Sequence, residues 1–486
     1  MALYVGQSIA RVEDLRFLTG QGKFTDDIGL EGQLYCSFLR SPHAHARIAR
    51  IDFVAARRAP GVAAVLSGAD YVADGLDGVQ HAPNPADPVD VSVRVFIAPP
   101  GERIVELAHW PLALDRVRHV GEPVAVVVAQ SAAMARDATE LIEVEYQPLP
   151  AVVSPLDAVE KGAPQLWEEA PGNLCFSLGY GDAGATRRAM EQAPHVIRHQ
   201  FVHNRVAPCT MEPRSALGAY DAISGLHTLI SGSQGAHAQR MVVSRALKLA
   251  PEKMRVICPD VGGGFGSRTS VYPEQIAVVW AARRLGRPVK WTGDRSEAFV
   301  SDYQGRESVV RAALALDREG VILGYELEWF ANLGSNTLSF VSLANSRRML
   351  SSVYHIPVAH VGSNAVLTNT VPTSAYRGTG RPEAIHMIER LLDMAARRIG
   401  IDRVEIRRRN IVRREMLPYR NVMGIVYDSG DFKGYMEKVL AAADWRGFDE
   451  RKAQARARQA CRNRRCEPYL RAGRRPVRAG HGPCSR

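Results

Sequence analysis

Proline and glycine divide this chain into short segments, and that punctuation limits the length of every element. Breaks stand at Ser41-Pro42, Pro60-Gly61, Gly121-Glu122-Pro123 and Gly286-Arg287-Pro288. Proline lacks the N–H that helices and inner strands need, so each break ends an element. The most apolar piece, Val124–Ala129, is far below the roughly 18 residues needed to span a bilayer. The sequence therefore predicts a globular protein with no membrane contact.

The first 150 residues combine strand-like and helical runs. Strands are predicted at Leu34–Leu39, Val62–Leu66, Val124–Ala129 and Ile142–Tyr146, and helices at Phe53–Arg58 and Ser131–Glu140. The strand at Val124–Ala129, the helix at Ser131–Glu140 and the strand at Ile142–Tyr146 follow one another directly and predict a βαβ-like unit. The Pro-, Asp- and Gly-rich stretch between Tyr71 and Gly101 is expected to be an exposed loop.

Strands dominate from about residue 160, with two clear helices. One is Tyr272–Leu285; the other is Pro382–Ile399, with Pro382 in its first turn and Gly400 at its end. The second helix carries one predicted apolar stripe: Ile385, Ile388, Leu391, Leu392 and Ala395. This pattern predicts the α+β class rather than a doubly wound sheet. A chain of 486 residues is too long for one core, so more than one domain is expected.

The formal net charge of +11 lies in the last 36 residues. Residues 451–486 hold eleven Arg and Lys452 against Glu467, and the rest of the chain is balanced. A nucleic-acid-binding surface is therefore not implied for the folded part. Apolar periodicity ends at Arg451, so the tail is either a disordered basic arm or the product of a damaged reading frame. Its cysteines and aromatic residue favour damage.

Cysteine spacing and the start of the chain exclude other classes. Cys36, Cys175, Cys209 and Cys258 are scattered singly, which excludes a local zinc or iron–sulfur site of the usual spacing. Charged residues occupy the positions where a signal peptide would need an apolar run. The expected location is the cytoplasm.

The strongest local signal is the glycine loop, Val261–Gly266, which follows a predicted strand at Met254–Cys258. Successive glycines let the backbone approach a bulky ligand and expose N–H donors. A tight turn without a ligand is the alternative, but four glycines in five positions exceed what a turn needs.

Two further segments have small residues around one polar side chain. In Ser231–His237, Gln234 could project into a cavity and donate its NH₂ to an oxo group. The alternative is a helix start with Ser233 as N-cap. Ala375–Glu383 presents Arg377 and the amides of a helix N-terminus to an anion. The alternative there is a Gly-Pro helix start with solvated arginines.

Other motifs are assigned no function. Gly179–Gly184 matches the dinucleotide-binding pattern, but no acidic residue follows at the required distance. His43 and His45 lack a nearby third metal ligand, so packing roles are expected. Arg407–Asn410 is expected to be a solvated helix end.

Taken in order, these segments resemble the molybdopterin-binding large subunit of the xanthine dehydrogenase, aldehyde oxidase and carbon monoxide dehydrogenase family. The match runs from about Tyr4 to Asp449 and includes Arg11–Asp14, Ser41–Ile48 and Gly121–Ala125 besides the three loops. The resemblance implies an α/β hammerhead domain at 18–148 and a molybdopterin-binding domain at 160–400. The start of a truncated second cofactor domain would lie at 401–450, before the non-native or disordered tail at 451–486.

The resemblance also implies roles for individual residues. Gln234, Phe265 and Arg377 would surround the molybdenum and meet around one buried pocket. Contacts to the cofactor are expected from Gln234, Gly235, Gly264, Phe265, Gly266, Arg377 and Gly378, and Thr269 and Thr379 would line the substrate pocket. The implied cofactor is molybdenum–molybdopterin in its cytosine dinucleotide form. The implied reaction is hydroxylation at carbon with water as the oxygen source.

The implied partners are an iron–sulfur small subunit and an FAD-binding medium subunit, which would carry the 2Fe-2S and FAD centres in a hetero-oligomer. Copper-type carbon monoxide dehydrogenases carry a cysteine where Gly378–Gly380 stands here. Xanthine-specific enzymes carry a glutamate where Thr269 stands. These departures favour an aldehyde or an N-heterocycle as the small-molecule substrate.

The family's general-base glutamate lies near the end of a longer chain, so no catalytic residue is assigned within this one. The sequence therefore predicts a molybdenum-dependent oxidoreductase subunit that is inactive or incomplete as this polypeptide. Two alternatives stay open: a non-catalytic molybdopterin-binding fragment, and, on the tail alone, a nucleic-acid-binding protein.

Overall fold

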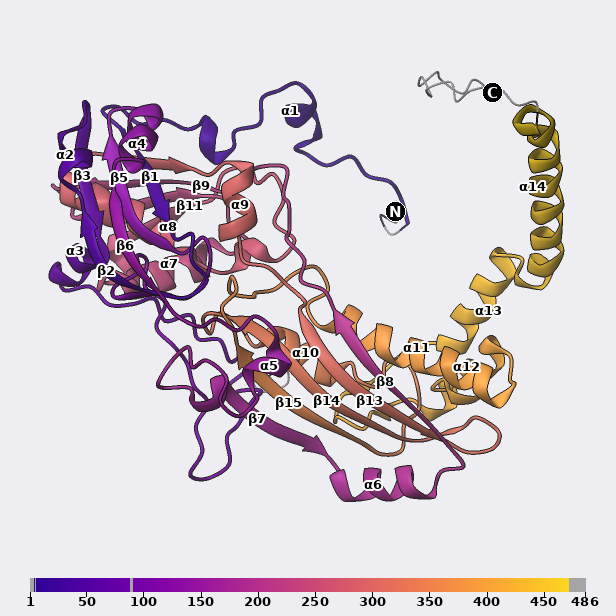
Figure 1. The fold of residues 1–486 in the computed structure, drawn as a ribbon. Helices are drawn as coiled ribbons and strands as arrows, with labels where there is room; N and C mark the ends of the chain where they lie inside the picture. Colours follow the sequence, from indigo (N-terminus) through magenta and orange to yellow (C-terminus); the bar gives the residue numbers. More distant parts are fainter. Residues whose placement is uncertain (1–3, 5, 88–90, 472–486) are drawn as a thin grey trace. The chain divides into compact units, whose positions relative to one another are not determined.

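The computed structural model describes residues 4, 6–87 and 91–471, with side chains described as far as residue 459 (Figure 1). The chain forms two units. The first runs to Asn410 and takes in Arg420–Ile425, and the second holds Ile411–Tyr419 and the residues from Val426 onward. In the described part of the chain, no helix is long and apolar enough to cross a membrane.

The strands of the first unit are β1 (Leu34–Arg40), β2 (Ala46–Asp52), β3 (Val62–Ser67), β4 (Arg116–Val117), β5 (Pro123–Ala129), β6 (Glu143–Pro148), β7 (Leu174–Gly181), β8 (His195–His203), β9 (Ser215–Asp221), β10 (Leu226–Ser231), β11 (Met254–Ile257), β12 (Val289–Thr292), β13 (Ser308–Leu316), β14 (Ile322–Gly334) and β15 (Ala359–Leu367). Its α-helices are α1 (Asp14–Leu18), α2 (Val54–Arg58), α3 (Gly68–Ala73), α4 (Ala132–Thr139), α5 (Pro155–Ala158), α6 (Ala183–Gln192), α7 (Ala236–Ala246), α8 (Pro273–Leu285), α9 (Arg295–Ser301), α10 (Val341–Arg348), α11 (Arg381–Ile399) and α12 (Arg403–Asn410). The separate, largely antiparallel sheets with interspersed helices confirm the predicted α+β class.

A seven-stranded sheet joins segments that lie far apart in the sequence. Its strand order is β11-β10-β9-β12-β1-β5-β3. Strand β1 pairs in parallel with β12, with Leu34 opposite Val289, and in antiparallel with β5. The first 150 residues and the residues after 160 therefore share one hydrogen-bonded sheet.

Strand β5 is buried on both faces of this sheet, which explains its unbroken apolar sequence. Val126 and Val128 pack in the same core cluster as helix α8. Ala125 and Val127 point the other way, into the cluster that includes Ala138 of α4. The helices predicted at Ser131–Glu140 and Tyr272–Leu285 are thus confirmed as α4 and α8, and they cover opposite faces of the sheet.

The predicted βαβ unit is wrong, although its three elements are present. Strand β5 pairs with β1 and β3, both antiparallel. Strand β6 instead pairs antiparallel with β2 in a separate three-stranded sheet of order β4-β2-β6. Apolar periodicity shows that a strand exists and which face is buried, but it does not show which strand is its neighbour.

A five-stranded sheet of order β7-β15-β14-β13-β8 forms the other large layer. Helix α11 packs against β8 and β13, and α6 packs on the opposite face, as Figure 1 shows. Residues Ile388, Leu391, Leu392 and Ala395 of α11 are fully buried, as predicted. Ile385 is not part of this stripe: it is 38% exposed, because the buried face continues through Ala384 and Met387.

The stretch from Tyr71 to Gly101 is irregular but not simply an exposed loop. It begins within α3, and its apolar side chains Leu76, Val79, Val95 and Phe96 are buried. The Val79 backbone also pairs with that of His109. Residues 88–90 lie outside the described part. The Pro- and Gly-rich composition correctly predicted an irregular backbone. It did not predict that the apolar side chains of this stretch would be buried.

The second unit contains helices α13 (Phe432–Ala442) and α14 (Phe448–Arg471) and the short strand β17 (Val426–Tyr427). The short strand β16 (Tyr419–Arg420) has one residue in each unit. Residues 451–471 of the tail, which the sequence predicts to be non-native or disordered, lie in helix α14. Its described side chains are exposed, and Ala, Arg, Gln and Lys favour a helix without needing an apolar stripe. Residues 472–486 lie outside the described residues.

Candidate functional site

Gln234 lies in the turn between β10 and α7. Its side-chain oxygen Oε1 accepts a hydrogen bond from the Gly266 backbone N–H at 2.8 Å. This bond fixes the orientation of the amide, so the Nε2 group faces away from Gly266 and has no hydrogen-bond partner among the described residues. The alternative reading of Ser233 as N-cap is wrong: Gly235 is the N-cap of α7, and the Ser233 hydroxyl accepts the Gly235 N–H at 3.0 Å.

The glycines of the glycine loop allow neighbouring loops to approach one another. A Cβ on Gly264 would lie 2.7 Å from Cδ of Gln234, and a Cβ on Gly266 would lie 2.6 Å from the Ala375 carbonyl oxygen. A Cβ on Gly262 would overlap Cβ of Glu212. Gly263 and Gly266 also have positive φ values of 109° and 99°. Close contact between loops therefore accounts for the glycines that a simple turn does not require.

Phe265 joins the glycine loop to the segment that precedes α11. Its carbonyl oxygen accepts the Arg377 backbone N–H at 2.8 Å. Its φ of 52° lies in the left-handed region, which is rare for an aromatic residue, and its side chain is 44% exposed. A residue held in such a conformation is a recurrent feature of functional sites.

The segment around Arg377 differs in one respect from the prediction. The Arg377 backbone N–H is already bonded to Phe265, so it is not free for an anion. The guanidinium is exposed and has no partner among the described side chains. Arg306, which sequence reasoning missed, holds this segment: its Nη2 donates to the Arg377 carbonyl oxygen at 2.6 Å, and its Nη1 lies 3.1 Å from Glu383.

The remaining predicted residues lie on the same three loops. Thr269 donates its hydroxyl to the Gly266 carbonyl oxygen at 2.7 Å, and Thr379 donates to the Tyr376 carbonyl oxygen at 3.1 Å. Gly378 has a φ of 94° and packs against Pro382. Gly235 begins α7.

Gln234, Phe265 and Arg377 therefore meet, as the sequence predicts, although they are far apart along the chain. They do not enclose a buried pocket, because all three are exposed in this structure. The arrangement offers an oriented amide donor, an exposed aromatic ring and an exposed guanidinium on three segments that are bonded to one another.

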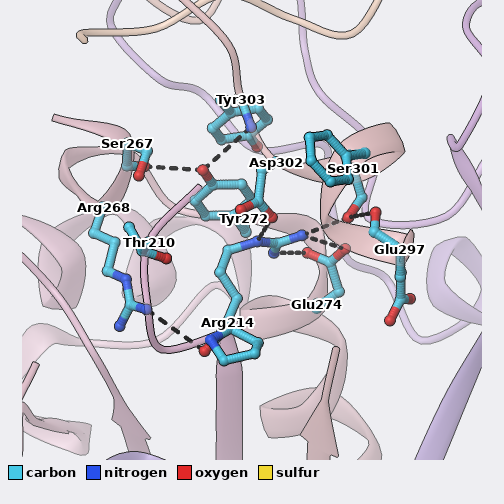
Figure 2. Close-up of polar contacts among 12 residues, drawn as sticks. Thr210, Arg214, Ser267, Arg268, Tyr272, Glu274, Glu297, Ser301, Asp302 and Tyr303 are labelled. Atoms are coloured by element: carbon cyan, nitrogen blue, oxygen red, sulfur yellow. Dashed lines mark hydrogen bonds and ion pairs between the residues drawn. The ribbon is translucent and has the colours of Figure 1, made fainter. Parts of the chain in front are cut away.

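A buried ion network is centred on Arg214 and Glu274 (Figure 2). Arg214 Nη1 lies 2.7 Å from Glu274 of α8, and its Nε lies 2.5 Å from Asp302. Arg40, at the end of β1, contacts Glu274 at 2.7 Å and Glu297 at 2.6 Å. Burial alone would raise the pKa of the Glu274 carboxyl, but the guanidinium groups of Arg214 and Arg40 lower it to about 2.

Two stacked tyrosines connect this network to the glycine loop. The rings of Tyr272 and Tyr303 are 3.9 Å apart, and the Arg214 guanidinium lies over Tyr272. The Tyr272 hydroxyl donates to the Ser267 carbonyl oxygen at 2.9 Å, one residue beyond the glycine loop (Figure 2). Tyr272 therefore links the buried ion network to the residue that follows the glycine loop.

The other sequence candidates have structural roles. His45 is buried, with Nδ1 2.7 Å from the Pro150 carbonyl oxygen, and His43 packs on Tyr146. Among the described residues, no group of His, Cys, Asp and Glu side chains could hold a metal ion. The Gly179–Gly184 segment crosses from β7 into α6, and β7 pairs antiparallel with β15.

Arg407 is not solvated, contrary to the prediction for Arg407–Asn410. Its guanidinium lies 2.7 Å from Glu389 and 3.0 Å from Asp393, both on α11. Asn410 is buried and donates to the carbonyl oxygens of Gly320 and Ile406. From the run of three arginines, the sequence did not predict that Arg407 of α12 forms ion pairs with α11.

Two family models match the chain. Residues 166–411 match the molybdopterin cofactor-binding domain. Residues 19–150 match the a/b hammerhead domain of aldehyde oxidase and xanthine dehydrogenase. The three loops described above lie within the first of these ranges.

Similar proteins include the gamma subunit of the 6-hydroxypseudooxynicotine dehydrogenase complex from Paenarthrobacter nicotinovorans, 34% identical over 93% of this chain and 56% of the relative. The carbon monoxide dehydrogenase large chain of Hydrogenophaga pseudoflava is 34% identical over 92% of this chain and 55% of its own length. The crystal structure of quinoline 2-oxidoreductase from Pseudomonas putida 86 superposes with a TM-score of 0.84, at 34% identity, over 93% of this chain and 56% of that one. The chain thus spans about half the length of these relatives.

Proposed function

The chain belongs to the family of molybdopterin-binding large subunits of aldehyde oxidase and xanthine dehydrogenase, and on that premise we propose that it is the large subunit of a molybdenum hydroxylase. Its substrate would be an N-heterocycle or an aldehyde, with water as the source of the oxygen. The observation that carries the proposal is the Gln234 amide, which Gly266 orients and whose NH₂ group has no partner among the residues that the structure describes.

The residues of the three loops fit a bulky anionic cofactor. The glycine loop presents the exposed Phe265 ring, the Gln234 NH₂ can donate to an oxo group, and the Arg377 guanidinium can pair with a phosphate. Molybdenum–molybdopterin would be held by Gln234, Gly235, Gly264, Phe265, Gly266, Arg377 and Gly378. When bound, the cofactor supplies a two-electron acceptor and activates water.

The chain's own residues would position the cofactor and exclude water from the reacting carbon. Gln234 would hold an oxo group through one hydrogen bond, because its amide cannot rotate without losing the Gly266 bond. The exposed Phe265 ring would form an apolar wall that keeps water from the reacting carbon. No catalytic acid or base is assigned to this chain.

N-heterocycles are the favoured substrate class. The relatives include a nicotine 6-hydroxylase large subunit and a quinoline 2-oxidoreductase, and both names denote N-heteroaromatic substrates. Three residues beyond Gly266 stands Thr269, whose hydroxyl is bonded to the backbone, and not a carboxylate. With Thr379, it would present a pocket wall of low charge, which suits an uncharged ring.

The proposal includes the partners. An iron–sulfur subunit and an FAD-binding subunit would carry the electrons away, the dinucleotide form of the cofactor would contain cytosine, and the complex would work in the cytoplasm. The relative from Paenarthrobacter is itself named as one subunit of a complex, which supports a hetero-oligomer.

The test is to purify the chain together with the two partner subunits and measure bound molybdenum, released cytosine nucleotide, and dye reduction with quinoline and benzaldehyde. Gln234→Ala should lower the molybdenum content severalfold, while Gln200→Ala, an exposed glutamine on β8, should not. Molybdenum without turnover would identify a non-catalytic molybdopterin-binding chain. Absence of molybdenum from the wild-type complex would overturn the proposal.

A further inference from the structure

Glu212 and Arg268 form a buried ion pair at the crossing of three segments. Arg268 Nη1 lies 2.6 Å from Glu212 Oε2, and the two side chains are only 4% and 10% exposed. Glu212 belongs to the segment before β9, and Arg268 to the 3-10 turn η4 (Ser267–Thr269) that follows the glycine loop. Figure 2 shows the Arg268 side chain directed toward the segment that carries Thr210 and Arg214.

Each member of the pair also binds backbone in a loop of the proposed site. Glu212 Oε2 accepts the Gly262 N–H at 2.8 Å, which ties the start of the glycine loop. The Arg268 carbonyl oxygen accepts the Gln234 N–H at 3.0 Å. Arg268 Nη2 also donates to the Glu212 carbonyl oxygen at 2.7 Å, so the guanidinium binds both the side chain and the backbone of Glu212.

Two glycines lie in close contact with the pair. A Cβ on Gly232 would overlap Arg268 Nη1, and a Cβ on Gly262 would overlap the Glu212 side chain. Gly232 and Gly262 therefore serve the pair rather than a ligand. Since the charges are buried, neither side chain can move to solvent without leaving its partner uncompensated.

We propose that Glu212 and Arg268 are positioning residues that set the separation between the Gln234 backbone and the glycine loop, and through it the direction of the Gln234 NH₂ group. Neither residue is among those that would hold the proposed cofactor. This inference rests on the proposed function only for its consequence for cofactor binding; the positioning itself is a property of the chain.

The first measurement is hydrogen exchange of the backbone amides in the purified chain. Glu212→Gln should speed exchange at Gly262 and Gln234 by about tenfold. The Gly262 N–H loses its charged acceptor, and the Arg268 carbonyl oxygen that accepts the Gln234 N–H is no longer held in place by the ion pair. The matched control is Glu307→Gln, which breaks another largely buried pair, that of Glu307 with Arg205. The control should lower the melting temperature without changing exchange at those two amides.

The second measurement separates positioning from stability. In the double variant Glu212→Gln/Arg268→Gln, no buried charge is left uncompensated, so the melting temperature should recover part of the loss seen in Glu212→Gln. Fast exchange at Gln234 and low molybdenum content of the complex should persist. Arg268→Lys, which keeps the charge, should retain more molybdenum than Arg268→Gln.

Unchanged exchange at Gln234 in the variants would overturn the inference, as would a double variant that regains molybdenum together with its melting temperature. If the single variants fail to fold, the double variant and Arg268→Lys carry the same comparison. If the wild-type complex contains no molybdenum, the proposed function fails, but the exchange result still decides whether the pair positions the loops.

Discussion

The backbone N–H of Arg377 donates to the carbonyl oxygen of Phe265 at 2.8 Å, and this bond joins the segment before α11 to the loop after β11. With the bond between Gln234 and Gly266, it makes three segments into one unit. A substitution in any one of them is therefore expected to displace the other two.

Gly264→Ala tests this coupling. The added Cβ would lie 2.7 Å from Cδ of Gln234, closer than real Cβ contacts, so the amide must leave its bond to Gly266. We expect molybdenum content to fall severalfold and the protein to lose about 1–3 kcal/mol of stability. Metal analysis and urea unfolding measure the two effects.

Gly184→Ala is the matched control for that substitution. Gly184 lies within α6, where a Cβ would meet its nearest neighbours at 3.5 Å, an ordinary contact. Alanine is favoured over glycine there by about 0.5–1 kcal/mol. Equal molybdenum loss in both variants would contradict the coupling.

Glu274→Gln should be strongly destabilising. Glu274 is buried and accepts from both Arg214 and Arg40, so its loss leaves two buried guanidinium groups with less compensation. We expect a loss of about 3–5 kcal/mol in the free energy of unfolding. Glu326→Gln, at a half-buried position on β14, should change it by less than about 1 kcal/mol. Urea unfolding midpoints compare the two.

Stability should decrease as the pH falls below 6.5. Burial lowers the pKa of His109 to about 4 and of His119 to about 3. Between those values and the ordinary 6.5, the unfolded chain binds more protons, so each histidine contributes stability above pH 6.5 that is lost toward its folded pKa. The loss is up to about 1.4 kcal/mol per pH unit for each group.

The variant His119→Gln isolates this effect. Burial raises the pKa of the neighbouring Glu122, which contributes with the opposite sign, so the wild-type curve alone is a sum. Urea midpoints of both proteins at pH 7.5 and 5.5 should show a shallower pH dependence in the variant. An equal dependence would exclude His119 as a contributor.

The corrected face of α11 gives a further comparison. Leu391 is fully buried, and Leu391→Ala should cost about 2–5 kcal/mol. Ile385 is 38% exposed, and Ile385→Ala should cost less than about 1 kcal/mol. Thermal unfolding measures both; equal losses would restore Ile385 to the stripe.

The sequence predicted the elements of the fold better than their pairing. The strand at Val124–Ala129 and the helices at Tyr272–Leu285 and Pro382–Ile399 are present because apolar period and Gly-Pro punctuation act locally. The partner of each strand depends on contacts between distant residues, such as Leu34 with Val289, which no local pattern encodes.

The meeting of Gln234, Phe265 and Arg377 was implied by the resemblance of their three loops, taken in order, to a known family. The residues that hold these three loops in place were not predicted. Glu212, Arg306 and Arg268 stand in no periodic pattern, and a buried ion pair between distant residues leaves no signal in a single sequence. The glycines at 232 and 262 were the signal closest to them, since they mark where the arginine and glutamate side chains need room.

The parallel pairing of β1 with β12 also constrains how the protein is made. Val289 leaves the ribosome 255 residues after Leu34 (289 − 34), which takes about 10–50 s at typical rates of synthesis. Until β12 is synthesised, the edge of β1 opposite β5 lacks the strand that it pairs with in the folded structure. The seven-stranded sheet therefore cannot be completed until β12 has been translated. We expect a chaperone that covers the unpaired edge of β1 to raise the yield of folded chain.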